Sequence, residues 1–239
     1  MGYLTKPLPV ASRTLRVLAR LLSYPDAALR EHLPELAAAL RTEAALSAAR
    51  LAELDDLIHW IAGPSRGSGL LAVEEAYVDL FDRGRSTSLQ LFEHVHGDSR
   101  ERGQAMIDLA QTFEKAGLFL APGEMPDYLP VVLEYASTQP PREARAFLGE
   151  MSHILNAIFA ALQQRETRYA SVLGALLELS GEKAKPVKVK PEESLDESWE
   201  EPVVFDGCST KGQSNQNQPQ TIHFVRKDGA NTAKIGVSV

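Results

Sequence analysis

The chain has 239 residues, enough for one domain with a sizeable core, and its 44% hydrophobic content is typical of a globular protein. Its formal net charge of -7 argues against a sequence-independent nucleic-acid binder, which needs a basic face for phosphate contacts. The one cysteine, Cys208, excludes an intramolecular disulfide, a cysteine-based zinc site and a cysteine-ligated iron–sulfur cluster. Arginines interrupt the apolar start of the chain and no stretch reaches 18 apolar residues, so we expect no signal peptide, no membrane span and a cytoplasmic protein.

Helical periodicity dominates residues 12–180. Apolar residues recur there at steps of three and four, the spacing of one face of an α-helix, and sustained period-two runs of Val, Ile and Thr are missing. The apolar stripes, in chain order, cover residues 15–22, 29–40, 51–61, 70–81, 106–120, 147–162 and 169–176. We therefore predict an all-α domain over residues 1–182, a bundle of about seven to nine helices.

Two segments of this chain carry loop and low-complexity signals. Residues 63–69, GPSRGSG, resemble a phosphate-binding loop, but no Lys-Ser/Thr pair follows and no strand precedes, so we interpret them as an interhelical linker. After Gly181, a basic block is followed by an acidic block and then by a run rich in Gln, Asn and Ser. Such a composition cannot bury enough apolar surface to offset the entropy of ordering, so residues 183–239 are predicted to be a largely disordered tail.

The densest polar stretch of the helical region is FEHVHGDSRERGQAM, which begins at residue 92. Residues 88–95, SLQLFEHV, which overlap the start of this stretch, have the apolar spacing of a helix. On a helix His94 and His96 point to opposite sides and cannot share one metal ion. A metal site would also need further ligands. A small metal-dependent hydrolase that uses His94, His96 and Asp98 nevertheless remains the alternative interpretation of this stretch.

The same stretch also fits a plain corner between two helices. Gly97 can take the left-handed conformation that ends one helix. Asp98 followed by Glu101 forms a capping-box-like start for the next helix. This interpretation leaves the histidines, Arg100 and Arg102 unexplained, and together they predict a dense polar surface around the corner.

A second stretch, APGEMPDYLPVVLEYAS, covers residues 121–137. Asp127 fits the N-cap of a helix whose first turn contains Pro130, where the missing N–H is not needed. Three prolines stiffen the loop before and into that helix. A rigid loop that bears an aromatic residue, Tyr128, is a suitable wall for a peptide-binding groove.

The two stretches together, YVDLFDRGRSTSLQLFEHVHGDSRERGQAM and MPDYLPVVLEYAS, resemble the nitrate reductase molybdenum cofactor assembly chaperones. This group, the NarJ type or nitrate reductase delta subunit, lies within the TorD/DmsD-like redox-enzyme maturation chaperones. The resemblance covers residues 15–181. At Tyr128 the relatives often carry His in a Glu-Pro-Asp-His-like loop, so their proposed nucleotide binding is not transferred to this chain.

The resemblance implies a TorD-like all-helical fold and a private cytoplasmic chaperone that is not an enzyme and needs no cofactor. The implied partner is the catalytic (alpha) subunit of a respiratory nitrate reductase, bound through its N-terminal segment. The chaperone would keep this apo subunit competent for insertion of the molybdenum cofactor and delay its docking at the membrane. It would itself bind no nucleic acid and would not insert into the membrane.

We predict that the client segment binds in a groove of the helical domain, with apolar contacts and a polar rim. The apolar contacts are assigned to Tyr77, Phe81, Leu91, Phe92 and Tyr128, although core packing explains the aromatic residues equally well. The polar rim is assigned to His94, His96, Asp98, Arg100 and Asp127. A third interpretation stays open, in which Arg100 and Arg102 hold the phosphates of the cofactor at a helix start.

Overall fold

The structure is a computed structural model that describes residues 10–63, 69–97, 99–182 and 184. These residues form ten α-helices and one short 3-10 helix, η1, all within one compact unit. In chain order they are α1 (Ser12–Leu21), α2 (Ala27–Glu43), α3 (Ala48–Ala62), α4 (Gly69–Phe81), η1 (Arg85–Thr87), α5 (Glu93–His96), α6 (Glu101–Lys115), α7 (Leu129–Thr138), α8 (Pro141–Glu150), α9 (Ser152–Gln164) and α10 (Ala170–Ser180). Most of the predicted tail and linker residues 64–68 lie outside the described residues.

The all-α prediction is confirmed, and within the described residues the number of α-helices is ten instead of seven to nine. One added helix comes from the apolar stripe 147–162, which is broken at Met151 between α8 and α9. Another break lies at Pro140 and Pro141, where proline cannot continue α7 but is well suited to begin α8. Apolar spacing alone does not reveal such breaks, because both helices keep facing the same core.

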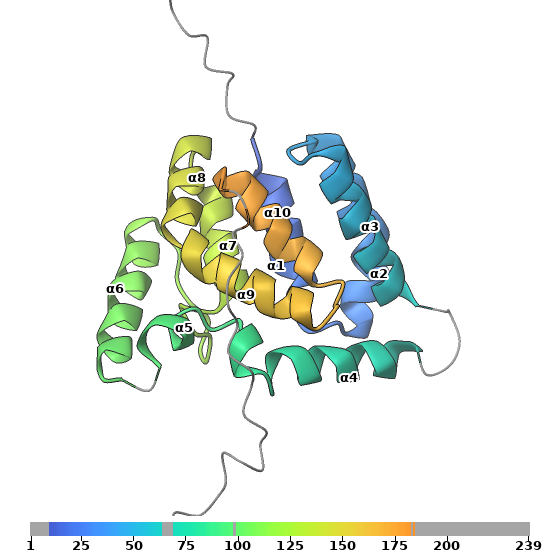
Figure 1. Cartoon of the computed structure of the whole chain (residues 1–239). Coiled ribbons are helices and arrows are strands. Elements are labelled where there is room, and N and C mark those ends of the chain that lie inside the picture. Colours follow the sequence, from blue (N-terminus) through green and yellow to red (C-terminus); the bar gives the residue numbers. More distant parts are fainter. Residues whose placement is uncertain (1–9, 64–68, 98, 183, 185–239) are drawn as a thin grey trace, which may run out of the picture. The chain divides into compact units, whose positions relative to one another are not determined.

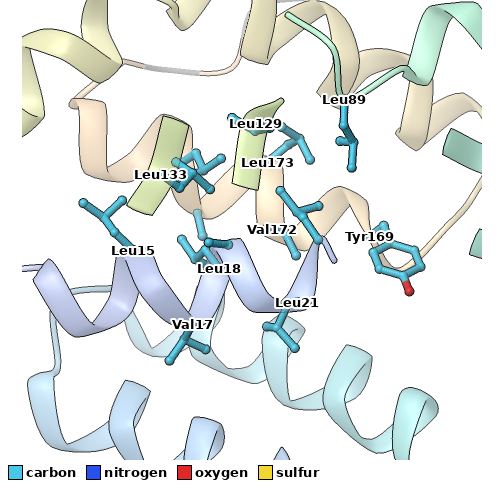
Figure 2. Packing of buried hydrophobic residues seen from close by; sticks show 14 of the residues in the cluster. Leu15, Val17, Leu18, Leu21, Leu89, Leu129, Leu133, Tyr169, Val172 and Leu173 are labelled. Atoms are coloured by element: carbon cyan, nitrogen blue, oxygen red, sulfur yellow. The ribbon is translucent and has the colours of Figure 1, made fainter. Parts of the chain in front are cut away.

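The core is centred on α1, α7 and α10, with α9 packed on α10 and with α2 and α3 on the other side of α1 (Figure 1). Leu15 and Leu18 of α1 face α7 and α10, whereas Val17 and Leu21 face the opposite way (Figure 2). All four are at most 3% exposed. Helix α10 is buried on nearly every side, as expected for a helix whose sequence is apolar all round.

Helix α6 is attached to this core differently. Figure 1 shows it at one flank, beside α5 and away from α1 and α10. Its main helix neighbour is α5, and Phe113 is its one buried residue. The candidate site lies where this flank meets the chain that enters α5 and α7.

Candidate functional site

Two loops that are distant in sequence cross at the flank of the bundle. The Leu91 N–H donates to the Asp127 carbonyl over 3.0 Å, and the Leu129 N–H donates to the Leu89 carbonyl over 2.8 Å. Between these bonds, Gln90 and Tyr128 form an isolated antiparallel bridge. We call this arrangement of residues 88–92 and 126–129 the loop crossing.

The loop crossing corrects the predicted helix over residues 88–95. Only Glu93–His96 are helical, as the four-residue α5, and residues 88–92 are not. The Leu89 carbonyl and the Leu91 N–H bond to the other loop, which leaves these two groups unavailable to a helix. Helical spacing of Leu89, Phe92 and Val95 was therefore overridden by tertiary hydrogen bonds.

Asp127 is the buried centre of the loop crossing, with 0% exposure. Its Oδ2 accepts the N–H of Phe92 over 3.2 Å, and it therefore holds the chain at the start of α5. The prediction that Asp127 is the N-cap of α7 is wrong: Tyr128 occupies that position and no side chain caps the helix. Pro130 does lie in the first turn, as predicted.

Arg102, on the first turn of α6, connects the polar groups at the crossing. Its Nη1 lies 3.3 Å from Glu93 Oε1 and its Nη2 lies 3.6 Å from Asp127 Oδ2. Glu93 also accepts the Ser88 hydroxyl over 2.5 Å, and His94 Nε2 donates to the Ser88 carbonyl over 2.8 Å. One guanidinium thus joins α6, α5 and the loop before α7.

The buried charge of Asp127 is only partly balanced by its neighbours. Burial raises the pKa of the Asp127 carboxyl above its usual value of 3.8, although the Phe92 N–H and the Arg102 guanidinium act to lower it. Within the described residues, Asp127 Oδ1 and Arg102 Nε are buried without a hydrogen-bond partner. The corner therefore holds a carboxylate whose loss of hydration is not fully offset by its partners.

Three of the predicted contact residues, Tyr77, Phe81 and Leu91, lie in the core at 5%, 7% and 1% exposure. The Tyr77 hydroxyl donates to the Leu22 carbonyl over 2.9 Å and lies 3.2 Å from the Tyr128 hydroxyl. In this structure they pack as core residues, the alternative that the sequence left open. Their contact with a client remains a prediction.

The predicted polar residues do not converge on one point. His94 is bonded to the Ser88 carbonyl, whereas His96 packs edge-on against Phe92 and lies 3.8 Å from Glu101. Asp98 lies outside the described residues. In the ranges that the structure describes, no group of three or more His, Cys, Asp or Glu side chains is arranged to hold a metal ion, so the metal-dependent hydrolase gains no support.

A groove of about 390 Å³ is lined in part by Glu124 and Val131, which lie just before and just after segment 126–129 of the loop crossing. We call it the α6 groove, because the end of α6 and the loop after it form one wall, and α1 and α7 form the other. Its apolar lining is contributed by Phe113, Leu118, Phe119, Leu120, Val131 and Tyr135. Arg16 and Arg20 line it from α1, with Glu124 and Glu134 from the loop and α7.

The sequence predicted a groove wall within residues 121–137, but it assigned none of the residues that line this groove to client contact. The available signal was GLFLAP, residues 117–122, an apolar triplet just after a helix end. Phe119 in this triplet is 80% exposed, which is unusual for a large aromatic side chain. A larger hollow of about 490 Å³ lies between the start of α1, α8 and the end of α10, but its charged residues Arg145 and Glu178 already bond to the protein itself.

The chain is similar to proteins of known assignment. A family model described as nitrate reductase delta subunit matches residues 24–173, more than half of the chain. The nitrate reductase molybdenum cofactor assembly chaperone NarJ of Escherichia coli K12 is 40% identical over 200 residues, covering 80% of this chain and 83% of that protein. The probable chaperone NarW of the same strain is 38% identical, with 80% and 82% coverage. The probable NarJ of Bacillus subtilis is 30% identical over 164 residues, with 69% and 86% coverage.

Among solved structures, a putative redox enzyme maturation protein from Archaeoglobus fulgidus aligns with a TM-score of 0.49 and 18% identity. The alignment covers 76% of this chain and 99% of that protein. No helix in the described part of this chain is both long and apolar enough to span a membrane.

Proposed function

Because this chain belongs to the nitrate reductase delta subunit family, we propose that it is a cytoplasmic assembly chaperone for a nitrate reductase, without enzymatic activity of its own. The observation that carries the proposal is 40% identity over 80% of this chain and 83% of a relative named as a molybdenum cofactor assembly chaperone. Similarity over most of both chains supports transfer of the whole role.

The client is the apo form of the catalytic (alpha) subunit, recognised through its N-terminal segment. Binding keeps that subunit competent for insertion of the molybdenum cofactor and delays its docking at the membrane. An all-helical receptor with an apolar groove on its surface suits a short segment that orders as it binds. The phosphates of the cofactor need no site on this chain, and Arg102 is already engaged with two carboxylates.

The client lies along the α6 groove and reaches the loop crossing. Its apolar side chains contact the groove lining, with Phe119 as the exposed anchor. The accessible members of the predicted apolar set, Phe92 and Tyr128, extend these contacts. The rim residues His94, His96, Asp98 and Arg100 contact the polar groups of the client. Tyr77, Phe81, Leu91 and Asp127 support the crossing from inside.

Simple energetics favours reversible binding. Four apolar client side chains gain about 6–12 kcal/mol on burial, at roughly 1.5–3 kcal/mol each. Ordering the client segment costs about 2–5 kcal/mol. The difference brackets the roughly 8 kcal/mol of a micromolar complex, an affinity that permits release after assembly.

The test is co-purification of the catalytic subunit with the tagged full chain from cells that lack molybdenum cofactor synthesis. We expect the apo subunit to be recovered, and its cofactor content to fall in cells that lack the chaperone. A catalytic subunit that is neither captured nor dependent on the chain for cofactor would contradict the proposal. Stoichiometric metal in the purified chain would favour the hydrolase alternative instead.

A pair of variants tests whether the client binds in the α6 groove. Phe119→Ala should weaken binding of a synthetic peptide of the client N-terminal segment about tenfold, because about 1.4 kcal/mol of apolar contact is lost. Leu71→Ala, on α4, removes another exposed apolar side chain, 66% exposed, that does not line the groove. The Leu71→Ala variant should bind the peptide as tightly as the wild type does. If both variants weakened binding to the same extent, the groove would not be the client site.

A further inference from the structure

We propose that Arg102 is a latch that holds the start of helix α6 against the loop crossing, and that release of this latch widens the α6 groove for the client. The proposal rests on the function proposed above and concerns the regulation of the same groove. In the free chaperone the latch is closed, and the client binds the open form, in which α6 has moved outward but its end still forms one wall of the groove. Arg102 acts here as a positioning residue that sets how often that form is populated.

The first support is the sparse attachment of α6. Phe113 is its one buried residue, and its ring packs against Tyr135 of α7 at a centroid distance of 4.8 Å. The apolar residues one to two turns earlier, Met106 and Leu109, are only half-buried. The helix is therefore held near its two ends, by Arg102 and by Phe113, and only loosely between them.

The second support is a pair of glycines that flank α6. Gly97 and Gly117 have φ of 54° and 80°, a backbone conformation that other residues rarely adopt. A Cβ placed on either glycine would meet nothing within 4 Å, so both lie in open space. Uncrowded glycines on both sides of a loosely packed helix are suitable hinges.

The third support is the balance of charge at the latch. Arg102 is the one described cation that pairs with both Glu93 and Asp127, and its contact with Asp127 is 3.6 Å long. Asp127 Oδ1 and Arg102 Nε have no hydrogen-bond partner within the described residues. A buried ion pair with unsatisfied atoms only weakly favours its closed arrangement, as an element that must open requires.

Opening of α6 would extend the groove along one face of α7. Val131 and Tyr135 are four residues apart on α7, so they share this face. Both are half-buried and both line the groove. Withdrawal of the Phe113 ring of α6 from Tyr135 would uncover more of this face.

If Arg102 is a latch, removal of its buried ion pair should strengthen client binding instead of weakening it. The apparent dissociation constant is the intrinsic one divided by the open fraction, so a variant that opens more often binds more tightly. Arg102→Ala should lower the dissociation constant of the client peptide about fivefold. A residue that merely contacted the client or supported the fold would instead weaken binding when removed.

The experiment combines hydrogen exchange and calorimetry on the full chain, with a synthetic peptide of the client N-terminal segment as the probe. In Arg102→Ala, amides of α6 should exchange about tenfold faster while those of α1, α7 and α10 keep their protection. Arg102→Lys, which keeps the charge, should lie between this variant and the wild type. The matched control is Arg41→Ala, which removes a 2.8 Å ion pair to Asp55 between α2 and α3 and should change neither reading.

Unchanged exchange of α6, or weaker peptide binding by a folded Arg102→Ala, would overturn the latch. Should this variant not fold, Asp127→Asn removes the charge of the buried partner without changing its shape and must show the same faster exchange of α6. A wild-type chain that binds no client peptide would instead contradict the proposed function. The exchange data would then still decide whether Arg102 holds α6.

Discussion

Helices α10 and α6 show how differently the two regions of this molecule are held. In α10, eight of eleven residues are buried, whereas in α6 one of fifteen is buried. The central helices are therefore stabilised by apolar area that no single contact dominates. Helix α6, by contrast, is attached mainly through one aromatic contact, Phe113 with Tyr135, and through the ion pairs of Arg102.

This difference suits a protein that must bind and release another. A client can displace only contacts whose loss costs little free energy, and such contacts are concentrated at the flank. The centre must stay intact meanwhile, because α1 and α7 form one wall of the groove. Stability is thus concentrated in the central helices, whereas the contacts that a client can displace are concentrated at the flank.

The largest expected effect comes from the centre. Leu18→Ala on α1 should lower the free energy of unfolding by about 3 kcal/mol, because the side chain is 0% exposed and its removal leaves a cavity. Leu109→Ala on α6 should cost less than about 1 kcal/mol, since that side chain is half-buried. Urea denaturation of both variants measures the comparison, and equal losses would show that α6 belongs to the cooperative core.

Two glycines give the next comparison. Gly84→Ala, just before η1, would bring a Cβ within 2.7 Å of the Leu80 carbonyl oxygen. We expect this crowding to destabilise the protein by about 2 kcal/mol. Gly103→Ala on α6 meets nothing within 4 Å and should stabilise the protein by up to about 1 kcal/mol through helix propensity.

Thermal and urea unfolding of the two alanine variants provide the measurement. Opposite signs are expected, because one glycine is needed for close approach and the other only loosens an exposed helix. A destabilised Gly103→Ala chain would indicate that α6 packs more tightly than its single buried residue, Phe113, suggests. A neutral Gly84→Ala chain would show that the turn between α4 and η1 can shift to accept the added methyl group.

The smallest expected effect is the pH dependence due to Asp127. Burial raises the pKa of this carboxyl above 3.8 in the folded chain, so the folded state binds the proton more tightly than the unfolded state does. Its contribution to stability is therefore most favourable below the unfolded pKa and is lost as pH rises through the folded pKa. The loss amounts to about 1.4 kcal/mol for each unit of pKa difference.

Comparison with Asp127→Asn isolates this contribution, because the amide does not titrate. The stability of the wild type relative to the variant should fall as pH rises above about 4 and then become constant above the folded pKa. Urea titrations at several pH values measure the difference. A rise of the relative stability with pH would mean that Arg102 outweighs burial at this site.

The helical domain was predictable because its signals are local. The stripes of α1 to α4 and of α10 record which side of each helix faces the core, and the structure buries those sides. Helix boundaries were less predictable where neighbouring helices face the same core, as at Met151. The all-α class follows from periodicity, whereas the number of helices does not.

The candidate site was predictable only in part. The sequence selected both loops that form the crossing, and the residues Asp127 and Tyr128 lie at its centre. It assigned Asp127 to the wrong partner, because local capping of α7 competes with the N–H of Phe92, 35 residues away. Helical spacing likewise concealed the non-helical residues 88–92, whose bonds reach the other loop.

By itself, the sequence determined the helical class, the polar corner after Phe92 and the family resemblance, because each depends on residue types at short, regular spacings. Only the tertiary structure decided that Arg102 joins Glu93 to Asp127, that Tyr77 and Leu91 are buried, and that Phe119 stands exposed beside a groove. These outcomes depend on which distant segments exclude water from one another. The identity of a charged or aromatic residue does not by itself show whether distant segments bury its side chain or leave it in solvent.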